Sequence, residues 1–158
     1  MSDGNFTVYL VGAINHGDGV NWWDDAEEEL DSLGFDVVKP FDCWEFGPED
    51  DYTVLPENGT LNEGTSHVVY DDEVLENNKD AVAEADALLV GWDMTRRTRG
   101  TMAEIVYAKE GLQSTPVVLW MRKAEEREEL DPAPRYYSDS ITPDLGTAVQ
   151  IIETLRSV

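Results

Sequence analysis

Short, continuously apolar runs alternate along the chain with longer segments in which apolar residues recur every three or four positions. The short runs have the length of buried strands and lie at residues 6–11, 35–39, 87–91, 116–120 and 136–141. The periodic segments are typical of helices with one buried face and lie at residues 21–33, 71–84 and 100–111 and after Pro143. This alternation predicts one α/β domain over residues 1–158, with a five-stranded, mainly parallel sheet and helices on both faces.

Three of the four predicted helices have an apolar stripe that should pack against the sheet. The stripes are Trp23, Ala26, Leu30 and Leu33 in the first helix, Val74, Leu75, Asn78, Val82 and Ala85 in the second, and Leu145, Val149, Ile152 and Leu155 in the last. Thr142 and Pro143 are expected to cap the last helix. Asn78 is polar within an apolar stripe, so its amide should bind either the backbone or a ligand.

Residues 41–70 show no sustained periodicity and are rich in proline, glycine, asparagine and acidic residues. A loop of that length in a compact domain is usually functional, so we expect a long loop or flap over a site. Trp44, Phe46 and Tyr52 either form aromatic walls of that site or pin the flap to the domain. A second irregular connection, acidic and containing proline, is expected at residues 125–135.

The charge balance narrows the choice of partners. The chain has 34 acidic and 11 basic residues, for a net charge of −23. Its hydrophobic content of 41%, with five tryptophans, argues against the disorder that acidic composition often indicates. The acids sit on helix faces, as expected for a protein from a salt-rich cytoplasm where screening tolerates such charge. Nucleic acid is not an expected partner, because there is no basic face.

Other classes of protein are disfavoured by simple absences in the sequence. No apolar run approaches the roughly 18 residues of a membrane span, and the N-terminus does not resemble a signal peptide, so we expect no membrane partner and a cytoplasmic location. Cys43 is the single cysteine, which rules out an internal disulfide. His16 and His67 have no companions at metal-ligand spacing, so we predict no metal site and no cofactor.

The candidate chemistry lies in residues 85–113, where an apolar strand, a polar loop with arginines and a helix follow one another. A second loop, beginning at Gly12, follows the first predicted strand and contains three glycines. In a parallel sheet both loops emerge at the carboxyl edge, where α/β proteins bind their ligands. We therefore expect the two loops to form one site.

Glu104 is the main candidate in this region, and it allows two interpretations. Thr101 and Glu104 have the S/T-x-x-E spacing of a capping box, which is a purely structural role. Alternatively, a glutamate in the first turn of a helix is kept ionised by the helix dipole. An ionised, positioned carboxylate suits nucleophilic attack on an electrophilic sugar carbon.

The motifs VYLVGAI near the start, D-x-L-L-V in the third predicted strand, and GTMAEIVYA followed by TPVVLW resemble the nucleoside 2-deoxyribosyltransferase family. That family includes relatives that hydrolyse nucleotide N-glycosidic bonds. The resemblance implies a flavodoxin-like or Rossmann-like domain in which Glu104 is the nucleophile and Tyr9 hydrogen-bonds to it. The substrate-binding residues that it implies are Gly12, Ala13, Ile14, Asn15, Asn78, Thr98, Arg99, Gly100, Thr101 and Met102.

Two positions depart from the transferase pattern. Thr98 stands where transferases carry an aspartate for the sugar 5′-hydroxyl, whereas the hydrolysing relatives have a small hydroxyl residue beside a 5′-phosphate. Arg96, Arg97 and Arg99 around it either favour a phosphorylated substrate or offset the acidic surface. Asn78 stands where the family has an aspartate that handles the base proton, and an amide cannot transfer that proton at neutral pH. Either Asn78 only orients the base, or another acid such as Asp93 does the proton work.

The expected activity is therefore cleavage or transfer at the N-glycosidic bond of a nucleoside or nucleoside 5′-monophosphate, through a covalent intermediate on Glu104. The alternative is a non-catalytic nucleotide-binding module that kept the pocket. The resemblance also implies a homodimer or larger assembly, in which Met102, Val106 and Tyr107 are candidate contacts.

The composition itself generates a prediction about salt. A net charge of −23 on a small domain repels itself, and the Debye length falls from roughly 30 Å at 0.01 M salt to about 3 Å at 1 M. The melting midpoint should therefore rise steeply between about 0.05 M and about 3 M KCl, mostly at the lower concentrations. Thermal melts across that series test this, and a midpoint that stays flat or falls would mean that the acids are not a salt adaptation.

Overall fold

The computed structural model describes residues 5–12, 22–39, 52–55, 67–93, 99–111, 115–122, 130 and 132–157. For residues 52–55, 67–75, 93 and 99–103 the description concerns the backbone alone. Of the predicted site residues, Ala13, Ile14, Asn15 and Thr98 lie outside the described residues. In the described part of the chain, no helix is long and apolar enough to cross a membrane.

The domain is built on a parallel sheet of five strands in the order β2-β1-β5-β6-β7. The strands are β1 (Thr7–Gly12), β2 (Asp36–Val38), β5 (Ala87–Asp93), β6 (Val117–Arg122) and β7 (Ser140–Thr142). All four pairings between neighbours are parallel. This is the flavodoxin-like order, which confirms the predicted fold class, and β1 lies inside the sheet because β2 and β5 flank it.

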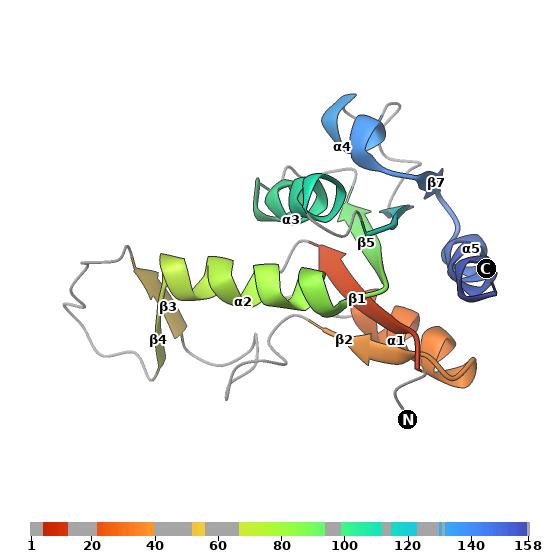
Figure 1. Cartoon of the computed structure of the whole chain (residues 1–158), viewed down its shortest axis with the longest axis horizontal. Coiled ribbons are helices and arrows are strands. Elements are labelled where there is room, and N and C mark those ends of the chain that lie inside the picture. Colours follow the sequence, from red (N-terminus) through yellow and green to blue (C-terminus); the bar gives the residue numbers. More distant parts are fainter. Residues whose placement is uncertain are drawn as a thin grey trace.

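Helices cover both faces of this sheet (Figure 1). The helices α1 (Trp22–Ser32) and α5 (Leu145–Arg156) pack on one face. The helices α2 (Asp71–Glu84) and α3 (Arg99–Glu110) pack on the other. Alternate residues of one strand therefore enter two separate cores, as a sheet buried on both faces requires. In β1, Val8 and Leu10 face α1 and α5, whereas Tyr9 and Val11 face α2 and α3.

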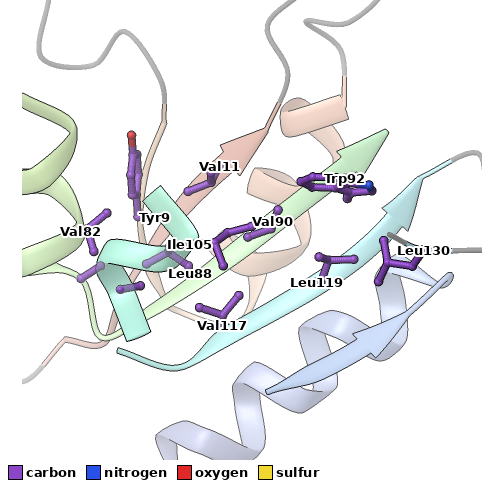
Figure 2. Packing of buried hydrophobic residues seen from close by; sticks show 12 residues of the cluster. Tyr9, Val11, Val82, Leu88, Val90, Trp92, Ile105, Val117, Leu119 and Leu130 are labelled. Atoms are coloured by element: carbon purple, nitrogen blue, oxygen red, sulfur yellow. The ribbon is translucent and has the colours of Figure 1, made fainter. Parts of the chain in front are cut away.

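The core on the α2–α3 face is drawn in Figure 2. It combines strand residues with Val82 of α2 and Ile105 of α3, which are 1% and 0% exposed. The predicted helix stripes are largely confirmed: Ala26 and Leu30 of α1 and Val149 and Ile152 of α5 are buried. Leu33 is an exception, since it lies beyond the end of α1 and is 37% exposed.

Residues 41–70 are not wholly irregular, which corrects the prediction of one long loop. They contain β3 (Tyr52–Leu55) and β4 (His67–Tyr70), which pair in parallel as a separate two-stranded sheet. This small sheet lies beside the N-terminal part of α2, away from the main sheet (Figure 1). Runs of four residues are too short for periodicity to reveal them among prolines, glycines and acids. The remaining residues of 41–70, including Trp44 and Phe46, lie outside the described residues.

The region after β6 also differs from the prediction. A short helix, α4 (Pro132–Tyr137), replaces part of the expected connection and strand. Its prolines occupy the first turn, where a missing N–H costs no intrahelical hydrogen bond. Asp144, rather than Thr142 or Pro143, is the N-cap of α5: its carboxylate accepts hydrogen bonds from the N–H and hydroxyl of Thr147, both at 2.8 Å. Thr142 instead accepts the N–H of Asp144 at 3.1 Å.

One arginine ties the end of the chain to the turn between α1 and β2. The guanidinium of Arg156 lies 4.1 Å from the centroid of the Phe35 ring and donates a hydrogen bond to the carbonyl of Leu33 at 2.9 Å. Glu153 holds the same guanidinium from within α5, at 2.6 Å. The last helix is thereby fastened to the segment that leads into β2.

The two cores predict how adjacent strand residues respond to truncation. Leu88 and Leu89 are neighbours in β5, both fully buried, but they face opposite sides of the sheet. Leu88→Ala and Leu89→Ala should each lower the free energy of unfolding by roughly 2–5 kcal/mol. Leu33→Ala, at an exposed leucine, is the control and should cost about 0.5 kcal/mol or less. Urea titrations measure all three, and a tolerated change at either strand position would mean that one face is open to solvent.

Candidate functional site

The strand order reverses at β1 and β5, which makes their carboxyl ends the topological switch point of the sheet. The chain leaves β1 towards α1 on one face of the sheet, and it leaves β5 towards α3 on the other. The two strands are neighbours, and Tyr9 pairs in register with Leu88 and Gly12 with Gly91. Doubly wound proteins bind ligands at such a point, outside the carboxyl ends of the strands. The carboxyl ends of β1 and β5 therefore lie at one edge of the sheet, as expected, whereas the loops that follow them lie outside the described residues.

Tyr9 and Glu104 meet on the α2–α3 face of the sheet. The Tyr9 hydroxyl donates a hydrogen bond to Oε2 of Glu104 at 2.7 Å, across 95 positions of sequence. Figure 2 shows the Tyr9 ring rising from β1 with its oxygen at the end away from the strand. The Tyr9 side chain is only 4% exposed and Glu104 is half-buried. Two residues that the sequence analysis paired are thus brought into direct contact.

Packing along α3 sets the position of Glu104. Ile105 and Ala108 are buried beneath the helix, which turns the preceding Glu104 towards the β1 side. At its far end Lys109 pairs with Asp139 at 2.7 Å, and Asp139 also accepts the N–H of Val117 at 2.7 Å. These contacts fasten the C-terminal end of α3, the helix that carries Glu104, to the start of β6.

The helix begins earlier than the sequence suggested, and this changes the interpretation of Glu104. Because α3 starts at Arg99, Thr101 lies inside the helix and Glu104 lies in its second turn. Thr101 is therefore not an N-cap, and the capping-box interpretation is wrong. The carboxylate of Glu104 instead accepts a hydrogen bond from Tyr9 of β1, and so it does not cap α3.

The protonation of Glu104 also differs from the expectation. Burial raises the pKa of Glu104 from its ordinary value of 4.5 to about 7, and the hydrogen bond from Tyr9 counteracts part of that rise. At neutral pH the group is therefore a mixture of acid and carboxylate, not the fully ionised group that the helix dipole alone would favour. A carboxyl group tuned to this range can exchange protons or act as a nucleophile when ionised.

The other described candidates lie on α2, at the end of β5 and in the first turn of α3. Asn78 is half-buried on α2, one turn before the buried Val82 and on the same helix face, so it lies on the side of α2 that packs towards α3 and β1. Asp93 ends β5, five residues beyond Leu88, the partner of Tyr9. At about 3.3 Å per residue, its backbone lies about 16 Å further along the sheet than that of Tyr9. Arg99, Gly100, Thr101 and Met102 form the first turn of α3.

Gly12 serves a purpose that the sequence did not reveal. The sequence analysis placed this glycine at the start of a ligand-binding loop. A Cβ on Gly12 would lie 2.5 Å from Cζ2 of Trp22, so the absence of a side chain already makes room for an indole. The Trp22 ring lies on the α1 face, opposite to Tyr9 and Glu104.

Trp22 belongs to an aromatic group that the sequence analysis missed. Its ring meets that of Trp120 edge to face at 6.3 Å, and the Arg122 guanidinium lies 5.4 Å from the Trp22 ring and 6.0 Å from that of Trp120. The sequence signal for this packing was that Gly12 and Gly91 each end an apolar run. The sequence does not show that the two glycines are neighbours, because that depends on the register of β1 and β5. Among the residues whose side chains are described, no cluster of histidine, cysteine, aspartate and glutamate could hold a metal ion.

The raised pKa of Glu104 predicts a pH-dependent stability. Because the folded-state pKa lies above the unfolded value of 4.5, the proton stabilises the folded protein fully below about pH 4.5, and this stability is lost as the pH rises through about 7. A rise to about 7 corresponds to roughly 3 kcal/mol. Glu104→Gln should therefore raise the free energy of unfolding at pH 8.5 by roughly 1–3 kcal/mol, and by less than about 1 kcal/mol at pH 5. Urea titrations at both values measure this.

Glu110→Gln is the matched control, since Glu110 is exposed on the same helix and its change removes the same charge. The Tyr9→Phe variant should raise the pKa of Glu104 further, because the hydroxyl stabilises the charged form. Carboxyl-carbon NMR titration of Glu104 follows that pKa directly. An equal gain from Glu110→Gln, or a lower pKa in Tyr9→Phe, would contradict this account of the pair.

Comparison with known proteins supports the fold and goes no further. No protein-family model matches the chain, and no curated protein matches it in sequence. The structure is similar to the crystal structure of a conserved protein from Enterococcus faecalis V583, with a TM-score of 0.55 and 13% sequence identity. The match covers 93% of this chain and 87% of the other. A likeness at this identity shows that the two chains share an α/β fold.

Proposed function

We propose that the protein cleaves or transfers at the N-glycosidic bond of a nucleoside or nucleoside 5′-monophosphate, with Glu104 as the nucleophile. The observation that carries the proposal is the hydrogen bond of 2.7 Å between the Tyr9 hydroxyl and the carboxylate of Glu104 at the switch point of the sheet. The hydrogen bond from Tyr9 holds one oxygen of Glu104 and thereby fixes the orientation of the carboxylate. Its pKa of about 7 gives a reactive ionised fraction at neutral pH.

In the proposed reaction an oxygen of ionised Glu104 attacks the anomeric carbon, and the bond from that carbon to the base nitrogen breaks. The base leaves with the electron pair and takes up a proton, and a glycosyl ester forms on Glu104. Attack on the ester by a second base gives transfer, whereas attack by water gives hydrolysis. Both restore the carboxylate, and two inversions give retention at the anomeric carbon.

The arginines before and at the start of α3 support a phosphorylated substrate. Arg99 begins that helix, and Arg96 and Arg97 precede it in a chain with few basic residues. Basic side chains near a helix N-terminus favour binding of a phosphate group. We therefore include the nucleoside 5′-monophosphate among the proposed substrates. The homodimer that the family resemblance implies, with contacts through α3, is also part of the proposal.

The alternative is a nucleotide-binding module without catalytic activity. It is favoured by Asn78, whose amide cannot supply a proton to the leaving base, and by the separation of about 16 Å between the backbones of Tyr9 and Asp93 along the sheet. Such a module would bind the same ligands and release no base.

Incubation with a panel of nucleosides and 5′-monophosphates, with and without a free acceptor base, distinguishes these functions by chromatography of the bases. We expect base release or exchange in the unaltered protein. Glu104→Gln should lower it by roughly a thousandfold or more, and Tyr9→Phe by about tenfold to a hundredfold. The control Glu110→Gln should retain activity, since its carboxylate is exposed at the end of α3.

A 2-fluoro-deoxyribosyl substrate should trap an adduct on Glu104, which peptide mass spectrometry locates. An adduct on another residue, or full activity of Glu104→Gln, would overturn the mechanism. Ligand binding by calorimetry without base release from any substrate would favour the binding module. Tighter binding of nucleosides than of their 5′-monophosphates would remove the phosphate from the proposal.

A further inference from the structure

Lys79 lies over an aromatic ring, although the chain is strongly acidic. Its ammonium is 5.5 Å from the centroid of the Tyr107 ring. The other two lysines whose side chains the structure describes, Lys39 and Lys109, each form an ion pair with an acidic side chain. A cation within about 6 Å of a ring centroid is attracted to the face of the ring. Because Lys79 belongs to α2 and Tyr107 to α3, this contact joins the two helices.

The contact lies close to Glu104 on both helices. Tyr107 follows Glu104 by three residues on α3, so the two side chains are neighbours on one side of that helix. Lys79 precedes Val82 by three residues on α2. Val82 packs in the same core as Tyr9, whose hydroxyl binds Glu104, and Figure 2 shows both residues on one face of the sheet. The helix α2 is therefore packed against the part of the core that holds the partner of Glu104.

The packing of α2 matters because burial determines the protonation of Glu104. Burial raises the pKa of this carboxyl group, whereas the hydrogen bond from Tyr9 lowers it. Water that reached the carboxyl group would favour its charged form and return the pKa towards the ordinary value. The titratable and charged groups that the contacts of this region bring to this side of the sheet are Tyr9 from β1, Lys79 from α2 and Tyr107 from α3.

We propose that Lys79 is a positioning residue for Glu104: by lying over Tyr107 it holds α2 against α3 and thereby keeps water from the carboxyl group. Lys79 acts through the ring and the helix, not through its own charge. The inference rests on the proposed function for its consequence, because the contact then sets the pH at which Glu104 becomes an ionised nucleophile. The contact itself is measured without any substrate.

The test is a double-mutant cycle of Lys79→Gln and Tyr107→Leu, with the pKa of Glu104 followed by carboxyl-carbon NMR. The attraction of an exposed cation to a ring changes an equilibrium by about twofold to fivefold. Tyr107→Leu should therefore lower the pKa of Glu104 by about 0.3–0.7 more in the unaltered protein than in the Lys79→Gln background. The difference between the two backgrounds excludes both the charge of Lys79 and the ordinary packing of Tyr107, since each contributes equally to the two sides of the cycle.

Conservative variants and a second lysine serve as controls. Lys79→Arg and Tyr107→Phe should each leave the pKa of Glu104 near that of the unaltered protein, because a guanidinium or a phenyl ring makes the same kind of contact. Lys109→Gln is the matched control on α3, since Lys109 pairs with Asp139 and not with a ring. In the Lys109→Gln background, Tyr107→Leu should lower the pKa as much as it does in the unaltered protein.

The outcomes separate this inference from the proposed function. Tyr107→Leu shifts that are equal with and without Lys79, or larger without it, would overturn the positioning role, whatever the protein catalyses. If no substrate releases its base, the proposed function fails and the coupling of the two side chains is still measured. With base release, the pH at which kcat/KM is half-maximal should fall in Tyr107→Leu together with the pKa of Glu104.

Discussion

The parallel pairing of β1 with β5 is the constraint on which the arrangement of the site depends. It sets Tyr9 beside Leu88 and Gly12 beside Gly91, although the paired residues are far apart in sequence. The chain then leaves β1 towards α1 on one face of the sheet and leaves β5 towards α3 on the other. The two faces of the sheet therefore carry different side chains near the ends of these strands. The polar pair of Tyr9 and Glu104 lies on one side, and the indole of Trp22 lies on the other. A shift of one residue in the pairing of β1 with β5 would turn the side chains of the shifted strand to the other face of the sheet. The contact of Tyr9 with Glu104 and the packing of Trp22 on the two glycines would then both be lost.

On the face of the sheet that carries Tyr9 and Glu104, burial has the largest effect on the pKa of Glu104. The helix dipole and the Tyr9 hydroxyl both favour the carboxylate, yet removal from water raises the pKa of Glu104 to about 7. The dipole acts most strongly in the first turn, and Glu104 lies in the second. Glu104 therefore combines a raised pKa with a hydrogen bond that fixes its direction. Glu104 is thus a carboxyl group of fixed direction that changes its protonation near neutral pH.

Continuous apolar strands and helical stripes predicted the sheet, its two covered faces and the bounds of α2, because hydrophobic periodicity is strong over such lengths. Four-residue strands such as β3 and β4 carry too little periodicity to be found. The helix α4 was hidden by prolines, which suit a first turn as well as a loop. In the site, the pairing of Tyr9 with Glu104 could be expected from motifs. The pKa of Glu104 and the packing of Trp22 on two glycines could not, since each depends on contacts between distant segments.

The contacts of Arg156 have a consequence for how the chain assembles as it is made. The turn between α1 and β2 lies near the beginning of the sequence, but the arginine that stacks on Phe35 and binds the carbonyl of Leu33 is among the last residues described. During synthesis this turn therefore acquires its full set of native contacts only after α5 has been made, 123 positions after Leu33. Until then the side chain of Phe35 lacks the guanidinium that stacks on it.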